Sequence, residues 1–356
     1  MNRFHTLRIT DVRQETADTV SLALVAPDHL RPSFAYQPGQ YLTLRTTLDG
    51  EELRRSYSIC SGLDDGEIRV AIKLVPDGRF SAWAHGALQP GHLIEAMPPQ
   101  GRFTITLDPA ASRTYLGIAA GSGITPVLSI LRSVLSREPG SRFVLLYGSR
   151  ATGGIIFREA LEELKDRFMA RLTVVHVLSR EQQDVPVLSG RLDGPRVRTL
   201  LRGLLDAPQI NHAFLCGPAA MIAEVSAALA DAGLPPERIH SELFTTGAPA
   251  TPRPRAAPAP DAPPFAVATV VSDGIRTDVP MEDGETVLEA ALRAGLDLPY
   301  SCRGGMCSTC RARVSEGAVR MDVNYGLEPW ETEAGYVLTC QAHPTTGRVL
   351  VDYDQV

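Results

Sequence analysis

The chain has 356 residues and a net charge of −6, with 44% hydrophobic and 21% charged residues. This length exceeds a single compact core, and no apolar run approaches the roughly 20 residues that cross a bilayer, so we expect two or three domains and no membrane span. The acidic balance argues against nucleic-acid binding, and residues 1–10 lack the apolar core of a secretory signal, so we expect a cytoplasmic protein.

The first part of the chain, up to about residue 108, alternates short apolar runs with Gly and Pro turns. The runs lie at residues 7–12, 19–24, 40–46, 67–74 and 92–96. Short strands at this spacing predict an antiparallel β-barrel or sandwich, which we expect to occupy residues 1–110 as a first domain.

Two short motifs lie near strand ends in this region. Residues 55–58 read RSYS at the end of a strand-like run, and residues 78–81 read GRFS after another. Arginine offers a planar charged fork that suits phosphate, and a glycine turn at a helix start can hold phosphate with its amides. The simpler interpretation is a core tyrosine and a surface arginine.

From residue 114 the pattern changes to strand, glycine turn and helix. Buried-strand runs lie at residues 115–120, 143–147, 172–177 and 212–216, and helical patterns lie at 126–135, 159–168 and 219–232. Strands that alternate with helices predict an α/β domain with a doubly wound parallel sheet, which we expect over residues 111–246.

A glycine-bearing string follows the first of these strands. Gly121 and Gly123 allow a dinucleotide to approach the backbone, while Thr125 is expected to cap the next helix and Pro126 to be its first residue. The string lacks the Gly-Lys-Ser/Thr of a Walker loop, so it favours a dinucleotide over a nucleoside triphosphate site.

Two further strand ends carry candidate residues. Cys216 is followed by Gly217 and Pro218 before a helix. A catalytic nucleophile is one interpretation of Cys216, but no His is placed by the sequence to activate its thiol. Ser179 and Arg180 follow the strand at 172–177, where an arginine suits a 2′-phosphate and favours NADPH over NADH. Arg150 and Arg191 are expected to assist, unless these arginines are solvated surface residues.

Residues 247–263 consist mostly of Pro and Ala and predict a semi-extended linker. Beyond it, residues 264–356 carry 14 acidic and 7 basic residues, a net charge of −7, whereas the rest of the chain carries +1. This split indicates that the C-terminal part docks on something basic.

Four of the six cysteines lie in this C-terminal part. Cys302, Cys307 and Cys310 share one glycine-bearing loop, and Cys340 follows 30 residues later. This spacing is that of a plant-type 2Fe–2S cluster, whereas zinc sites more often show two separated Cys-x2-Cys pairs. A zinc site or unpaired buried thiols are the alternatives. A helix at 284–295 and strands at 265–271 and 349–353 predict a small α+β domain around the loop.

Two resemblances extend these observations. Residues 298–310, LPYSCRGGMCSTC, carry a resemblance to plant-type ferredoxins over about ninety residues, which implies a β-grasp ferredoxin domain at 264–356. Residues 4–246, with RSYS, GRFS and the two glycine strings, resemble the ferredoxin–NADP reductase superfamily, which implies that FAD lies on the barrel and the nicotinamide nucleotide on the α/β domain.

The second resemblance also implies individual roles. Arg55 pairs with the FAD pyrophosphate, Ser56 and Tyr57 flank the flavin, and Ser58 hydrogen-bonds its N5 region. The remaining implied contacts are with FAD at Lys73, Gly78, Phe80, Ser81 and Phe244, and with the nucleotide at Gly121, Gly123, Thr125, Pro126, Ser179, Arg180, Cys216, Gly217 and Pro218. Ser58, Thr125 and Cys216 are the implied catalytic residues.

The order of FAD barrel, nicotinamide domain, linker and ferredoxin resembles oxygenase reductases, above all those of phenylacetyl-CoA epoxidases, and also ketosteroid hydroxylase reductases. It implies electron flow from NADPH (NADH remains possible) through FAD and the 2Fe–2S cluster to a di-iron oxygenase. A stand-alone NAD(P)H diaphorase and an iron–sulfur redox sensor without turnover are the alternatives.

Overall fold

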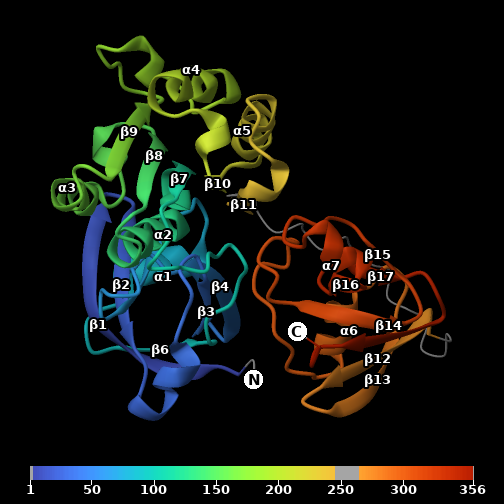
Figure 1. The fold of residues 1–356 in the computed structure, drawn as a ribbon. Helices are drawn as coiled ribbons and strands as arrows, with labels where there is room; N and C mark the ends of the chain where they lie inside the picture. Colours follow the sequence, from blue (N-terminus) through green and yellow to red (C-terminus); the bar gives the residue numbers. More distant parts are fainter. Residues whose placement is uncertain (1–2, 245–263, 356) are drawn as a thin grey trace. The chain divides into compact units, whose positions relative to one another are not determined.

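The computed structural model describes residues 3–244 and 264–355, so the predicted linker at 247–263 lies outside the described residues. These residues form two compact units, one made of nearly all of residues 4–244 and the other chiefly of residues 264–355 (Figure 1). Within the described ranges, no helix is both long and apolar enough to cross a membrane.

The first half of the first unit is a six-stranded antiparallel sheet in the order β4-β3-β6-β1-β2-β5. Ile59, just after β4, bridges to Val70 of β5, so the two edges of the sheet meet and it closes as a barrel. This confirms the predicted antiparallel domain. Its elements are β1 His5–Thr16, β2 Thr19–Val25, β3 Tyr41–Leu48, β4 Glu51–Ser58, β5 Ile68–Lys73, α1 Arg79–Ala87 and β6 Leu93–Ala96.

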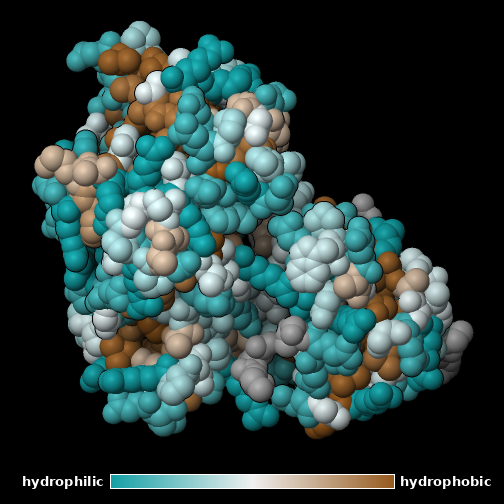
Figure 2. Space-filling model, viewed as in Figure 1, coloured by the Kyte–Doolittle hydropathy of each residue, from teal (hydrophilic) through white to brown (hydrophobic). Residues whose placement is uncertain are grey.

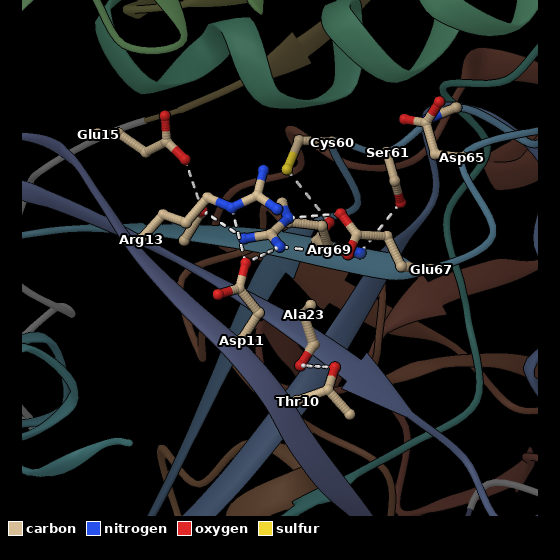
Figure 3. Close-up of polar contacts among 12 residues, drawn as sticks. Thr10, Asp11, Arg13, Glu15, Ala23, Cys60, Ser61, Asp65, Glu67 and Arg69 are labelled. Atoms are coloured by element: carbon tan, nitrogen blue, oxygen red, sulfur yellow. Dashed lines mark hydrogen bonds and ion pairs between the residues drawn. The ribbon is translucent and has the colours of Figure 1, made fainter. Parts of the chain in front are cut away.

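A polar network centred on the buried Arg69, on the face of β5 opposite the barrel core, fixes the segment that follows β4 (Figure 3). The Arg69 guanidinium donates to Asp11 (2.6 Å) and to Glu67 (2.6 Å), which joins β1 to β5. The backbone of Arg69 in turn pairs with the next segment: its amide donates to Ser61 Oγ (3.0 Å), and its carbonyl accepts from the Cys60 amide (2.8 Å) and Cys60 Sγ (3.2 Å). The residues after the RSYS motif are therefore anchored to the outer face of β5.

The second half of the first unit is a five-stranded parallel sheet in the order β11-β10-β7-β8-β9. Helices α2 and α3 pack on one face, whereas α4 and α5 pack on the other, which confirms the doubly wound prediction (Figure 1). The elements are β7 Thr114–Ala120, α2 Ile124–Arg137, β8 Arg142–Ser149, α3 Arg158–Arg167, β9 Leu172–Leu178, α4 Gly194–Leu204, β10 His212–Gly217, α5 Ala219–Asp231 and β11 Ile239–Leu243.

The predicted start of α2 is wrong. A short 3-10 turn at Gly121–Gly123 runs directly into the helix, so Ile124 is its first residue and Gly123 its N-cap. Thr125 and Pro126 therefore lie within the first turn. The Thr125 hydroxyl donates back to the carbonyl of Ser122 (3.0 Å) and does not cap the helix. The sequence pattern missed this because a 3-10 turn lets the backbone curl before the capping residue types appear.

The second unit is built on a mixed five-stranded sheet in the order β13-β12-β18-β14-β16, with α6 packed on it and a two-stranded sheet of β15 and β17 beside it. The predicted helix at 284–295 is confirmed but shorter: Thr286 caps it in a capping box with Glu289. The elements are β12 Ala266–Ser272, β13 Ile275–Met281, α6 Val287–Arg293, β14 Arg311–Glu316, β15 Val319–Met321, α7 Pro329–Glu333, β16 Tyr336–Leu338, β17 Ala342–Pro344 and β18 Arg348–Asp352.

The face of both units that Figure 2 shows is mostly polar. Figure 2 shows hydrophilic residues over most of the visible face of each unit, with hydrophobic residues in separate patches. Large exposed apolar side chains include Met169 in the first unit and Tyr325 and Trp330 in the second. This distribution fits the mixed charge and composition of the sequence.

Candidate functional site

The switch point of the parallel sheet lies between β7 and β10, because the chain order runs outward from these two strands in opposite directions. Ligands of doubly wound sheets bind beyond the carboxyl ends of the strands at such a point. The loop after β7 and the end of β10 meet there: a Cβ added to Gly123 would lie 2.3 Å from the carbonyl oxygen of Cys216. The two glycine strings predicted from the sequence are therefore in contact, and position 123 requires glycine.

Buried groups hold this loop in shape. Gly121 has φ +55°, and its carbonyl accepts a hydrogen bond from the hydroxyl of Tyr147 (3.0 Å), a fully buried residue of β8. At the end of β10, a Cβ on Gly217 would lie 2.6 Å from Cε of Met221. Pro218 then precedes α5 as its N-cap residue. These contacts fix the backbone of both strand-end loops. A ligand at the switch point would therefore lie against the outer surface of these loops and not between them.

Three polar side chains from three strands converge beside this loop. Cys216 of β10 pairs directly with Glu242 of β11, and the hydroxyl of Ser58, the last residue of β4, donates to the Glu242 carboxylate (3.4 Å). Loss of hydration raises the pKa of Glu242 to about 8, although the Ser58 hydroxyl opposes the shift. Burial also raises the pKa of the Cys216 thiol. At neutral pH the cluster of groups is therefore uncharged.

This electrostatic state bears on the rival interpretation of Cys216. A nucleophilic cysteine needs a thiolate, which a neighbouring base or positive charge stabilises. Here burial and the neighbouring Glu242 both oppose ionisation. The geometry therefore disfavours a cysteine nucleophile. Glu242 itself was missed as a site residue, and the one signal that could have found it is its position two residues before Phe244.

Phe244 continues the line of β11 past its last residue. Its backbone amide donates to the carbonyl of Gly217 (2.9 Å), and its ring packs, half-buried, against the core of the first unit. The structure thus places the predicted terminal aromatic beside the Cys216 string.

The RSYS residues lie on β4, with Arg55, Ser56 and Tyr57 half-buried. Arg55 Nη1 donates to the carbonyl of Arg54 (2.7 Å). The ring of Tyr57 packs at 5.6 Å on Phe80, which is buried in the barrel core. Phe80 therefore supports Tyr57 from below and is not itself exposed to a ligand.

The GRFS turn is self-contained. The Ser81 hydroxyl donates to the carbonyl of Gly78 (2.9 Å) and accepts from the amide of Val75 (3.2 Å). A Cβ on Gly78 would lie 2.6 Å from Ser81 Oγ, so glycine is required where α1 begins. Lys73 pairs with Asp18 (3.2 Å). The side chains of Ser81 and Lys73 already bond within the protein. A phosphate at this turn would therefore bind to backbone groups.

The segment after RSYS is clamped to α2, the helix that starts at the glycine loop. The Ser129 hydroxyl donates to the carbonyl of Ser61 (2.7 Å), and the amide of Leu63 donates to Ser133 Oγ (3.1 Å). Both serines are fully buried. The strand that carries Ser58 and the helix that carries Thr125 are thereby held in one rigid body.

The far end of the sheet carries two arginines. The amide of Arg180 donates to the carbonyl of Arg150 (2.7 Å), so the ends of β8 and β9 lie side by side. Arg150, Ser179 and Arg180 are exposed. The neighbouring Glu181 is held by Thr152, whose amide (2.7 Å) and hydroxyl (2.6 Å) both donate to its carboxylate. Positive charge at this edge is therefore available to an anion.

In the second unit the four cysteines of the predicted cluster group in two pairs. The amide of Cys302 donates to Cys307 Sγ (3.4 Å) and the amide of Cys307 to Cys302 Sγ (3.4 Å), whereas the carbonyl of Cys310 accepts from the amide of Thr339 (3.2 Å), the residue before Cys340. In the described residues no three His, Cys, Asp or Glu side chains surround a position suited to one metal ion. A 2Fe–2S cluster takes two ligands on each iron, so this pairing fits it better than a single tetrahedral zinc ion.

The loop around these sulfurs directs backbone amides inward. The amides of Gly304 (3.3 Å) and Cys307 (3.4 Å) donate to Cys302 Sγ. Together with the Cys307 thiol they lower the pKa of Cys302. The loop needs positive φ at three residues to do this, namely Arg303, Gly305 and Ser308. All six cysteines of the chain are described and none forms a disulfide.

Comparison with known families agrees with this geometry. An oxidoreductase FAD-binding domain matches residues 6–105, an oxidoreductase NAD-binding domain matches 118–227, and a 2Fe-2S iron-sulfur cluster binding domain matches 270–345. The three matches define a class of oxidoreductase that uses FAD, a nicotinamide nucleotide and a 2Fe–2S cluster within one chain.

Three relatives align along nearly the whole chain. A subunit of the 1,2-phenylacetyl-CoA epoxidase of Escherichia coli is 43% identical over 99% of both chains. The ferredoxin reductase component of Rhodococcus rhodochrous 3-ketosteroid-9-alpha-monooxygenase is 36% identical (98% of this chain, 96% of the relative), and the glycine betaine monooxygenase reductase subunit of Pseudomonas aeruginosa is 32% identical (99% and 96%). The chain belongs to this family of oxygenase reductase components.

Solved structures share the fold. Phthalate dioxygenase reductase aligns with a TM-score of 0.59 at 22% identity, over 98% of each chain. An intact type IV self-sufficient cytochrome P450 monooxygenase aligns with a TM-score of 0.68 at 22% identity, over 98% of this chain and 41% of that one. FAD, a nicotinamide nucleotide and the 2Fe–2S cluster are therefore the cofactors of this reductase.

Proposed function

We propose that this reductase takes electrons from NADPH and delivers them to a di-iron oxygenase, with a phenylacetyl-CoA epoxidase as the acceptor. The observation that carries the reductase chemistry is the convergence of Ser58, Cys216 and Glu242 beside the Gly123 loop at the sheet's switch point. The choice of acceptor is supported by the 43% identity with the aligned component of the Escherichia coli epoxidase.

The residues at the switch point bind and orient the nicotinamide. Gly121 and Gly123 let its ring approach the backbone, Thr125 and Pro126 line the first turn of α2, and Gly217 and Pro218 bound the opposite side. Bound FAD supplies the chemistry that couples a two-electron donor to a one-electron carrier. Reacting groups held about 3–3.5 Å apart gain most from such fixed positioning.

The three polar groups beside the loop, those of Ser58, Cys216 and Glu242, are protonated at neutral pH. Because the pKa of Glu242 is raised to about 8, its carboxyl holds a proton at neutral pH while one of its oxygens accepts the hydrogen bond from the Ser58 hydroxyl. Ser58 stands at the end of β4, after the other RSYS residues, which we assign to FAD together with Lys73, Gly78, Ser81 and Phe244. Phe80 acts on FAD only through the ring of Tyr57, which it supports. The neutral Cys216 excludes water from the same place.

NADPH is the preferred nucleotide in this proposal. Arg150 and Arg180 lie exposed at the ends of adjacent strands, and the neighbouring acidic residue, Glu181, is occupied by Thr152. A carboxylate at such a strand end would favour the ribose hydroxyls of NADH, whereas arginines favour the 2′-phosphate. Ser179 and Arg191 are the remaining proposed contacts.

We propose one domain for each of the three cofactors. Residues 1–110 bind FAD, 111–246 bind the nucleotide and 264–356 hold the cluster through Cys302, Cys307, Cys310 and Cys340. Residues 247–263 are proposed as the linker.

Reconstitution tests the acceptor. The reductase is mixed with NADPH, oxygen and the oxygenase components of either a phenylacetyl-CoA epoxidase or a 3-ketosteroid monooxygenase, and product is measured. We expect epoxide in the first mixture and little product in the second. Product only with the steroid enzyme would contradict the acceptor. NADPH oxidation in air that no oxygenase accelerates would favour a stand-alone diaphorase, and no oxidation even with ferricyanide would favour a redox sensor.

A further inference from the structure

The fourth cluster ligand stands apart from the other three. Cys340 lies in the turn between β16 and β17, whereas the other ligands share the loop at 302–310. A bond between these two segments would fix where the fourth sulfur lies relative to the other three. Gln341, the residue after Cys340, makes such a bond.

Gln341 is a buried polar side chain, 8% exposed, in the second unit. Its Nε2 lies 2.9 Å from the carbonyl oxygen of Arg303, within the three-cysteine loop. It also lies 2.9 Å from the carbonyl oxygen of Cys340 and 3.6 Å from Cys340 Sγ. The backbone of Gln341 is itself fixed, because its carbonyl accepts from the amide of Asp322 (3.1 Å).

The bond to Arg303 supports a strained point of the loop. Arg303 has φ +51°, a conformation that is uncommon for residues with a side chain. Two residues later, Gly305 is packed so closely that a Cβ there would lie 3.3 Å from Cγ of Gln341. The side chain of Gln341 therefore lies against the part of the loop whose backbone must be held in an unusual shape.

The bond to sulfur has an electrostatic consequence. The amide of Gln341 has two hydrogens for its three acceptors, so one serves Arg303 and the other lies between the carbonyl and the sulfur of Cys340. An ionised sulfur is the stronger acceptor. Reduction of a cluster adds negative charge that its sulfurs share, so a donor to sulfur stabilises the reduced form.

We propose that Gln341 is a positioning residue for the cluster: its amide joins the turn of Cys340 to the three-cysteine loop and raises the cluster's reduction potential by donating to Cys340 Sγ. The inference rests on the proposed ligation by the four cysteines.

The test compares the full-length wild type, loaded with FAD and cluster under anaerobic conditions, with Gln341→Met and Gln341→Glu. Methionine keeps the length of the side chain without its N–H groups, and glutamate keeps the shape but replaces the donor by a negative charge. The control is Gln355→Met, the same change at an exposed glutamine of the same unit. Iron, acid-labile sulfide and the electron paramagnetic resonance signal of the reduced cluster are measured in a mediated redox titration.

At a fixed potential we expect the ratio of reduced to oxidised cluster to fall about threefold to tenfold in Gln341→Met, where tenfold corresponds to about 59 mV for one electron. The ratio of reduced to oxidised cluster should fall further in Gln341→Glu, and in Gln355→Met it should match that of the wild type. Because the titration follows the cluster's own signal, partial loss of iron does not obscure it.

Two results would overturn the inference: loaded Gln341→Met and Gln341→Glu with the wild-type potential, or complete loss of cluster in both variants while Gln355→Met stays loaded, since Gln341 would then be needed for assembly and not for tuning. A wild type without iron and sulfide is a different outcome, because it removes the ligation by the four cysteines itself.

Discussion

The proposed cluster site and the proposed flavin–nicotinamide site are built from the chain in opposite ways. Three of the four cysteines come from one loop, residues 302–310. The other site joins the end of β4, the loop after β7 and the ends of β10 and β11, so no stretch of sequence contains it. The spacing of the cysteines alone predicts the cluster site, whereas the residues of the flavin–nicotinamide site come together only once the sheet has formed.

The two sites also treat charge differently. The cluster loop directs amides at sulfur and so stabilises negative charge. The strand ends around Cys216 and Glu242 do the reverse, because burial keeps both groups protonated at neutral pH. Five substitutions test this contrast.

Removal of the distant ligand should have the largest effect. We expect Cys340→Ala to lose iron and acid-labile sulfide and to slow NADPH-dependent reduction of cytochrome c more than about 100-fold, because one iron loses half of its protein ligands. Reduction of ferricyanide by the flavin should change less than about twofold, because only the cluster site depends on this cysteine. The control, Cys60→Ala, removes a buried cysteine of the barrel and should keep its iron. A cluster retained in Cys340→Ala would contradict the ligand assignment.

The nicotinamide loop should tolerate no side chain at its closest approach. In Gly123→Ala the new Cβ would meet backbone atoms of Cys216 at 2.3 and 2.6 Å, which no rotamer can relieve. We expect anaerobic flavin reduction by NADPH, followed in a stopped-flow instrument, to slow by about 100-fold. Gly203→Ala, in open space on α4, should leave the rate unchanged. Equal effects of the two substitutions would show that the close approach does not matter.

The raised pKa of Glu242 predicts a pH-dependent penalty on stability. The folded protein binds this proton more tightly than the unfolded chain, so the proton's contribution to stability is fully present below about pH 4.5. This contribution is lost as the pH rises to about 8, by on the order of 4–5 kcal/mol. Glu242→Gln carries no such proton. Its advantage in unfolding free energy should grow between pH 5 and pH 8.5, measured with denaturant on the FAD-loaded protein.

The control for this prediction is Glu224→Gln, an exposed residue of α5, whose difference from the wild type should not depend on pH. A constant difference for Glu242→Gln over the same range would mean that the carboxyl is ionised in the folded protein.

The nucleotide preference should depend on a single exposed arginine. We expect Arg180→Ala to raise the KM for NADPH about tenfold with kcat unchanged, because one charge-assisted hydrogen bond to the 2′-phosphate is lost. The KM for NADH should stay within about twofold, since NADH has no such phosphate. Ferricyanide reduction gives both constants. Arg202→Ala on α4 is the matched control, and a parallel rise for both nucleotides in Arg180→Ala would remove the 2′-phosphate contact.

The clamp between α2 and the segment after β4 should give the smallest effect. Ser129→Ala loses the hydrogen bond to Ser61 and should lower the unfolding free energy by about 1 kcal/mol. Because other contacts of α2 remain, flavin reduction should slow less than about threefold. Ser136→Ala, on the same helix, removes an exposed hydrogen bond to Asp64 of the same segment (2.7 Å) and should cost less in both measurements, because water replaces an exposed bond. A larger effect at Ser136 would show that the buried bond does not hold the helix.

The sequence predicted most of the fold because local patterns determine it. The alternating barrel strands, the strand–helix alternation and the cysteine spacing are all readable within short windows. The start of α2 was wrong by two residues, since a 3-10 turn precedes it. β11 was missed because its polar residues give a weak strand pattern; only its pairing with β10 makes it a strand.

Two residues of the proposed sites, Glu242 and Gln341, could not be found from short windows of sequence. Glu242 belongs to β11, and its chemistry arises from its neighbours on β10 and β4. Gln341 follows a cysteine, but its bond to Arg303 spans 38 residues of sequence. Both depend on contacts that only the folded chain makes, whereas the glycine strings and the four cysteines carry their own spacing.

One chain that passes electrons from a nicotinamide nucleotide through FAD to its own cluster should lose both absorption bands in an anaerobic NADPH titration. The wild type and Cys340→Ala are titrated while the flavin and cluster absorption bands are followed. In the wild type we expect both bands to bleach. The variant should have only the flavin band, and that band should bleach. A wild-type protein whose flavin bleaches while its cluster band stays unchanged would contradict this electron transfer.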